Sequence, residues 1–165
     1  QLAIPEPDEP LSYGLSTLER NTLGTGQVQS APLLARYGDT AYRANGNYGV
    51  EYNLSLPLYN DTDSPKTVAL AVQTPIQNDS MSDALQFYAS PAERVFFRGT
   101  VLFLYKEDNG RSRAAYTYVV QNSGQQGQPL VTMTLAPREQ RDVTVQFLYP
   151  PDATPPQVLT ISTQR

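Results

Sequence analysis

Alternation of apolar and polar residues is the clearest pattern in the chain. Between residues 48 and 58 every second residue is apolar, and the positions between them carry glycine, acid, amide, hydroxyl and proline. This period of two predicts a strand with one buried face. Pro57 donates no backbone hydrogen bond, so we expect this end of the strand at a sheet edge or a bulge. Residues 59–65 are turn-forming and residues 68–76 alternate again, which predicts that the two strands pair as a hairpin.

Further strands follow at short spacing. Residues 95–105 form a long apolar run, and Asn109-Gly110 predicts a two-residue hairpin turn. The returning strand alternates at Ala114, Tyr116, Tyr118 and Val120, and three more strands are expected at residues 130–135, 143–149 and 158–163. The turns are polar and no long helical pattern intervenes. The sequence therefore predicts an all-β antiparallel sandwich, immunoglobulin-like or jelly-roll-like, of about seven to nine strands, with a closed barrel as the alternative.

The first 46 residues differ in composition from the rest. Prolines and acidic residues alternate over residues 1–10, which predicts an extended arm. A short helical turn is expected within residues 15–23, and a short edge strand at 27–30. We therefore divide the chain into an arm, 1–46, and a β-sandwich domain, 47–165.

The arm also carries apolar side chains that a disordered tail has little reason to carry: Leu2, Ile4, Leu11, Tyr13, Leu15 and Leu18. An extended segment with such residues can cover an exposed sheet edge, either on its own domain or on another copy of the chain. We expect the arm to pack on a sandwich surface, with donation to another copy as the less favoured case. A linker from an upstream domain is the alternative.

Composition narrows the chemistry. The chain has no histidine, cysteine or tryptophan, which removes histidine-dependent catalytic triads and the usual zinc and iron–sulfur ligands. We expect no enzyme activity, no catalytic residue, no metal and no cofactor. The net charge of -4 argues against a nucleic-acid partner. No apolar run reaches the roughly 18 residues of a membrane-spanning helix.

Tyrosine is abundant, with 11 residues in the chain. Tyrosine rings stack on sugars, and arginine pairs with acidic groups, so aromatic residues in irregular segments beside arginines are candidates for a glycan site. The candidate ligand-binding residues are Tyr37, Tyr42, Tyr59, Tyr88, Arg94 and Arg98. The alternative interpretation assigns the strand tyrosines to the core and the arginines to ion pairs on the surface.

Several segments of the chain also resemble a known family. They are FRGTV at 97–101, GQQGQPLV at 124–131 and YPPDATPPQVL at 149–159, together with NYGV at 47–50 and LPLYN at 56–60. These segments are similar to an uncharacterised family of exported cyanobacterial proteins, the domain of unknown function 3370, over residues 37–163. Members of that family are usually longer, so the resemblance implies that this chain is their C-terminal part. It also implies a cyanobacterial source and a location in the periplasm, at the cell surface or outside the cell.

These observations favour a non-enzymatic structural or interaction module of the cell envelope or extracellular matrix, with the N-terminal arm as a route to assembly. Its partner would be another protein or a further copy of the chain, forming an oligomer or filament. The alternative is a carbohydrate-binding module that uses the loop tyrosines and arginines to bind a polysaccharide.

Overall fold

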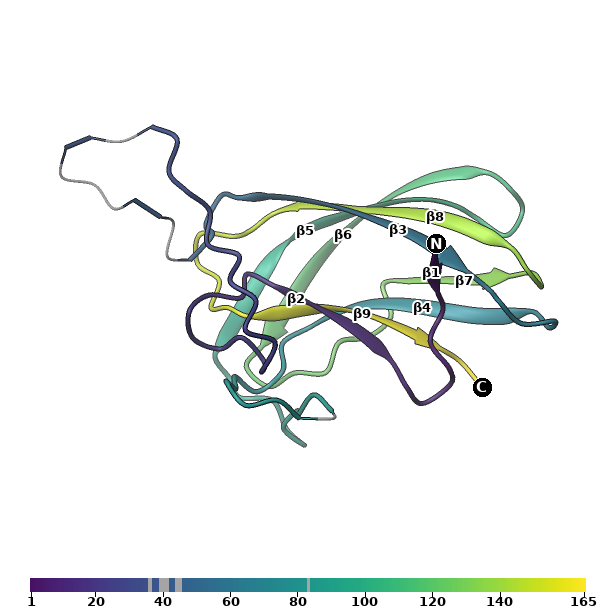
Figure 1. Cartoon of the computed structure of the whole chain (residues 1–165), viewed down its shortest axis with the longest axis horizontal. Coiled ribbons are helices and arrows are strands. Elements are labelled where there is room, and N and C mark those ends of the chain that lie inside the picture. The colour runs from purple at the N-terminus through teal and green to yellow at the C-terminus, as the bar shows by residue number, and fades with distance from the viewer. Residues whose placement is uncertain (36, 39–41, 44–45, 83) are drawn as a thin grey trace.

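The computed structural model of the protein describes residues 1–35, 37–38, 42–43, 46–82 and 84–165. Nine strands form two sheets that pack face to face as a sandwich (Figure 1). No helix occurs among the residues described. The predicted all-β sandwich is confirmed, and its two separate sheets exclude the closed barrel.

The larger sheet has five strands. In spatial order they are β1 (Leu2–Ala3), β3 (Glu51–Tyr59), β8 (Gln140–Leu148), β5 (Val95–Lys106) and β6 (Ser112–Asn122). All neighbours are antiparallel except β1, which runs parallel to β3. The β5–β6 pair is the expected long hairpin, but its loop is longer than the expected two-residue turn at Asn109-Gly110. The Glu107 N–H donates to Arg111 O at 2.9 Å, and Gly110, whose φ is 81°, donates to Glu107 O at 2.8 Å.

The smaller sheet has four strands, all antiparallel. Their spatial order is β2 (Leu11–Leu15), β9 (Gln157–Thr163), β4 (Lys66–Gln73) and β7 (Val131–Leu135). The strand β4 lies between two neighbours, and its residues from Val68 to Gln73 are all buried.

The predicted hairpin between residues 48–58 and 68–76 is wrong. The two strands, β3 and β4, lie in different sheets and are joined by a turn that crosses between the sheets. Asn60 holds this turn, because its buried side-chain amide donates to the carbonyls of Ser64 and Ala136, each at 2.9 Å. Alternation defines which face of a strand is buried, but either arrangement of two such strands satisfies it.

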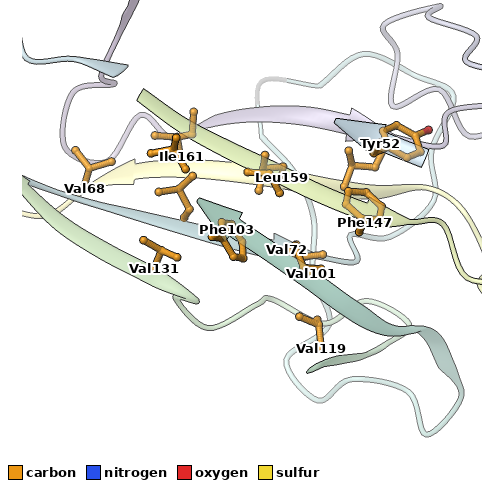
Figure 2. Close-up of a cluster of buried hydrophobic side chains, with 14 of the residues drawn as sticks. Tyr52, Val68, Val72, Val101, Phe103, Val119, Val131, Phe147, Leu159 and Ile161 are labelled. Atoms are coloured by element: carbon orange, nitrogen blue, oxygen red, sulfur yellow. The ribbon is translucent and has the colours of Figure 1, made fainter. Parts of the chain in front are cut away.

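The core fills the space between the sheets (Figure 2). Inward-facing side chains of both sheets contribute to it, including Val72 and Leu159 from the smaller sheet and Val101 and Phe103 from the larger one. Full burial of such a side chain stabilises the fold by about 1.5–3 kcal/mol. The rings of Tyr52 and Phe147 stack with centroids 4.9 Å apart.

The first 15 residues supply a strand to each sheet. β1 lies on the edge of the larger sheet beside β3, and β2 lies on the edge of the smaller sheet beside β9. Ile4 and Leu15 are buried in the core, and Leu2 packs against it. The chain therefore crosses from one sheet to the other between Ile4 and Leu11, and both sheet edges on this side are built from the N-terminal segment.

Two expectations for the segment after β2 are wrong. Residues 15–23 form no helical turn, because Ser16, Asn21 and Leu23 have positive φ angles of 55°, 61° and 56° that a right-handed helix excludes. Residues 27–30 form no strand. Instead Gln29 ties this segment to β2: its backbone N–H donates to Thr17 O at 2.7 Å, and its side chain donates to Gly14 O at 2.7 Å.

Between β2 and β3 the chain leaves one end of the sandwich (Figure 1). A buried polar cluster anchors the base of this segment. The Asn47 side chain donates to Gln29 O at 2.7 Å and accepts from Ala31 N at 3.1 Å, while the Tyr52 hydroxyl donates to Gln29 Oε1 at 2.8 Å. Burial raises the pKa of Tyr52 above its ordinary value, so this hydroxyl stays neutral.

Candidate functional site

The outer face of the five-stranded sheet carries two exposed tyrosines on its edge strand β6. Tyr116 is 71% exposed and Tyr118 is 65% exposed. Val119, which follows Tyr118 on β6, points into the sandwich and belongs to the core. Successive outward positions of a strand lie about 6.8 Å apart, so the two side chains are neighbours on the same outer face.

The strand register extends this surface across the sheet. On β5, Leu102 lies opposite Tyr116 and Thr100 lies opposite Tyr118. Gln146 of β8 is paired with Leu102, and Leu148 of the same strand is paired with Glu51 of β3. A shallow depression of about 410 Å³ follows these residues, and its lining consists of Glu51, Thr100, Leu102, Tyr116, Gln146, Phe147 and Leu148.

This arrangement suits a ligand that is apolar on one face and polar at its rim. The tyrosine rings and the leucines Leu102 and Leu148 offer apolar surface, while Thr100 and Gln146 offer a hydroxyl and an amide that both donate and accept hydrogen bonds. We name this surface the tyrosine face, defined by Tyr116, Tyr118, Thr100, Leu102, Gln146, Leu148 and Glu51.

The arginines expected to bind a ligand are engaged within the protein. Arg98 lies on β5 beside the tyrosine face, and its Nε donates to Asp152 at 2.7 Å. The guanidinium of Arg94 lies over the ring of Phe96, 5.4 Å from its centroid. The Arg98 contact is an ion pair, as in the alternative interpretation, whereas Arg94 makes a cation–π contact instead.

The four candidate tyrosines lie in three separate places. Tyr37 and Tyr42 lie on the segment between β2 and β3 that leaves the sandwich, and they are 82% and 76% exposed. Tyr88 packs against Gly124, whose carbonyl accepts its backbone N–H at 2.9 Å. Tyr59 was expected in an irregular segment, but it is half-buried at the end of β3, at the opposite end of the sandwich from Arg98.

Sequence reasoning missed Tyr116 and Tyr118 because it read the wrong side of β6. Alternate residues Ala114, Tyr116, Tyr118 and Val120 are the more apolar set, so they were treated as strand residues and not as an exposed platform. In the fold the set containing Val119 faces the core. The pattern of β6 alone offers no signal that separates the two sides, and the strand register is needed to place Tyr116 and Tyr118 on the outer face.

A second cavity, of about 770 Å³, lies where the β5–β6 turn meets the start of β8. Five of the seven charged side chains in its lining form ion pairs with one another, and Lys106 and Asp142 are in none of the ion pairs among the described residues. The buried Arg141 guanidinium pairs with Asp108 at 2.6 Å and with Glu139 at 2.7 Å, and it donates to Thr134 O at 2.9 Å. Arg113 pairs with Glu107 at 2.7 Å. This cluster joins two turns and stabilises the fold.

In the described part of the chain, no group of three or more acids is placed to hold a metal ion.

A third surface is the open side of the sandwich, between the edge strands β2 and β3. It is an apolar groove of about 350 Å³, lined on the arm side by Leu2, Leu11 and Tyr13. Across the groove lie Leu54 and Leu56 of β3. Three of the six apolar arm residues, Leu2, Leu11 and Tyr13, border this groove. Of the other three, Ile4 and Leu15 are in the core and Leu18 is half-buried.

Comparison with known proteins identifies the family. A family model described as "Protein of unknown function (DUF3370)" matches residues 1–163, and the chain belongs to this family. The match is wider than the expected 37–163 and includes the N-terminal strands. No curated protein matches the sequence.

One solved structure is similar at low level. It is named "Family 16 Carbohydrate Binding Module-2", with 10% identity, a TM-score of 0.29, and coverage of 82% of this chain and 84% of that one. A likeness this distant carries no argument about the ligand. Among the described residues no helix is long and apolar enough to pass through a membrane.

Proposed function

We propose that this member of the DUF3370 family is a non-enzymatic interaction module that binds a glycan chain on its tyrosine face. The observation that carries the proposal is the pair Tyr116 and Tyr118, which expose most of their rings at successive outward positions of one strand. We place the module at the cell envelope or in the extracellular matrix on the family resemblance alone.

The physical argument begins with the exposed rings. Single exposed apolar side chains are common on monomers, but a contiguous patch of them marks an interaction site, and Tyr116, Tyr118 and Leu148 are all exposed on this one face. The C–H face of a sugar ring packs on an aromatic ring, while its hydroxyls need hydrogen-bond partners at the rim. Thr100 and Gln146 are such partners within the same depression.

The test is glycan binding by variants of the two tyrosines. We expect the full chain to bind members of a glycan array, and the Tyr116→Ala/Tyr118→Ala double variant to bind the same glycans at least roughly tenfold more weakly in calorimetry. The melting temperature should stay within about 2 °C of the parent, because both rings are mostly exposed.

The matched control is the Tyr37→Ala/Tyr42→Ala variant, which removes two tyrosines that are also exposed but lie away from the tyrosine face. It should bind like the parent. Loss of binding in this variant alone would move the site to the segment between β2 and β3, as the sequence suggested. An array without hits would refute glycan binding. A change of oligomeric state in the Tyr116/Tyr118 variant would indicate that a second copy of the chain covers this face.

Self-association on the open side is the second candidate function, and a specific feature favours it. β1 covers only Leu58 and Tyr59 of β3, so the rest of that strand has a free edge beside the apolar groove. Free edges accept strands from other chains. We propose a second copy as the occupant. Sedimentation velocity should then show concentration-dependent association that Leu11→Asp abolishes, and a monomer at every concentration would refute it.

A further inference from the structure

The tyrosine face also indicates which glycan it takes, and this step rests on the proposed function. We infer that the bound glycan is uncharged and lies across the strands, from the tyrosines of β6 to Glu51 of β3. Two independent observations carry the inference: the charges that line the depression, and the register that sets its direction.

The depression carries one negative charge, which comes from a single acidic side chain in its lining. Glu51 is the single charged side chain in its lining, and it belongs to none of the ion pairs among the described residues. Arg98, which lies on the same outer face two residues before Thr100 on β5, is paired with Asp152 at 2.7 Å. The chain also has a net charge of -4. A uronate or sulfate group would therefore meet an uncompensated carboxylate, and like charges at this range repel each other.

Glu51 instead suits a hydroxyl-bearing sugar. An ionised carboxylate accepts hydrogen bonds at both oxygens, and bonds to a charged acceptor are stronger than bonds between neutral groups. Adjacent hydroxyls of an uncharged sugar supply two such donors. Thr100 and Gln146 lie between Glu51 and Tyr116 along the depression and offer the remaining partners.

The direction follows from the pairing of four strands. Tyr116 is opposite Leu102, Leu102 is opposite Gln146, and Gln146 is opposite Asn53 on β3. The next outward row starts at Tyr118 and Thr100 and ends at the pair of Leu148 and Glu51. Three interstrand spacings span about 14 Å, which corresponds to about three sugar rings lying across the strands.

The experiment uses matched neutral and acidic oligosaccharides. The probes are β-1,4-linked glucose and mannose oligomers of two to six rings, each compared with the oligomer of the corresponding uronic acid. We expect affinity for a neutral series to rise up to about three or four rings and then to level off. The uronate of equal length should bind at least about tenfold more weakly at low salt, and the difference should shrink at high salt.

Glu51→Gln is the decisive variant because it removes the charge and keeps the shape. It should raise uronate affinity severalfold and lower neutral affinity severalfold, because the amide keeps one acceptor oxygen and carries no charge. Uronates that bind the parent as tightly as neutral oligomers would overturn this inference and leave the proposed function standing. Failure of all four series to bind would overturn both. Equal affinity for neutral oligomers of two and six rings would refute the inference that the glycan lies across the strands.

Discussion

Tyr149 is the largest side chain that the fold buries completely, and its hydroxyl relies on one acceptor. It donates to Gln157 Oε1 at 2.6 Å, and Gln157 Nε2 in turn donates to Thr154 O at 2.8 Å. Burial raises the pKa of Tyr149 far above its ordinary value, so the ring stays neutral. The pair links the end of β8 to the start of β9 and thereby joins the two sheets.

Replacement of Tyr149 by phenylalanine tests this link. Tyr149→Phe leaves the buried Gln157 carbonyl without its donor, which should cost about 1–3 kcal/mol in the free energy of unfolding. Urea denaturation followed by circular dichroism measures the loss. The matched control is Tyr116→Phe, whose hydroxyl lies on an exposed ring and should change stability by less than about 0.5 kcal/mol. Equal stability of the two variants would show that the buried hydrogen bond contributes nothing.

The ion pairs around Arg141 make the stability of the fold depend on pH. The hydrogen bond from Arg113 lowers the pKa of Glu107. Burial by itself would raise the pKa of Asp108, but hydrogen bonds from Arg141 and Thr134 outweigh it and lower the pKa overall. Both carboxylates thus have lower pKa values when folded, so their contribution is complete above the unfolded value of about 4 and is lost as the pH falls through the folded values.

We therefore expect the melting temperature to fall as the pH is lowered below about 4. Asp108→Asn removes one of the two titrations, so its melting temperature should be lower than that of the parent at pH 7 and should fall less steeply in acid. Asp61→Asn is the matched control, because Asp61 is exposed and makes none of the ion pairs found among the described residues. Parallel curves for Asp108→Asn and the parent would contradict the role of this cluster.

At the scale of single strands, the sequence predicts where a strand occurs better than it predicts which strands pair. β3, β5 and β8 were predicted where they occur, because each buries one face and exposes the other. Which strands pair was not predictable, because the buried Asn60 turn that carries the chain to the other sheet has the same composition as a hairpin turn.

The tyrosine face was missed for a related reason. An edge strand such as β6 carries apolar residues on both sides, Val119 inward and Tyr118 outward, so its pattern does not identify the buried side. The β5 partners decide it, since Leu102 and Thr100 share the outer side with the tyrosines. Arg94 and Arg98 were found by composition, but their partners, Phe96 and Asp152, depend on local geometry and on a distant loop.

The strand β2 offers a matched pair of leucines for testing how far the N-terminal segment contributes to the core. Leu15 is 1% exposed and Leu11 is 43% exposed on the same strand. Leu15→Ala should cost about 2–5 kcal/mol in the free energy of unfolding, because it removes buried apolar atoms and leaves a cavity. Leu11→Ala should cost less than about 1 kcal/mol. Similar values for both would indicate that β2 is not held in the sandwich in solution.

At the scale of the whole molecule, the N-terminal segment borders one side of the sandwich and the tyrosine face lies on an outer surface of the larger sheet. β2 forms the edge of the smaller sheet, β1 covers only the end of β3 in the larger sheet, and the groove between β2 and β3 is apolar. The residues that would bind a glycan belong to β3, β5, β6 and β8, and none belongs to the arm. Binding and self-association can therefore be separated by mutation.

The last prediction concerns the cooperativity of the molecule. Ile4 and Leu15 lie in the same core cluster as residues of both sheets, so the N-terminal segment and the sandwich should unfold together in one transition. Far-ultraviolet and tyrosine near-ultraviolet circular dichroism should give coincident melting curves. Deletion of residues 1–26 removes both buried side chains and exposes two sheet edges, and it should lower the melting temperature by at least roughly 10 °C.

Two controls decide how this result is read. The deletion variant should retain glycan binding below its melting temperature, because the tyrosine face contains no residue of the segment removed. Its association state, measured by sedimentation, reports separately on the open side. If the deletion variant keeps the melting temperature and the association state of the parent, the N-terminal segment is only a linker, and self-association through the arm loses its support.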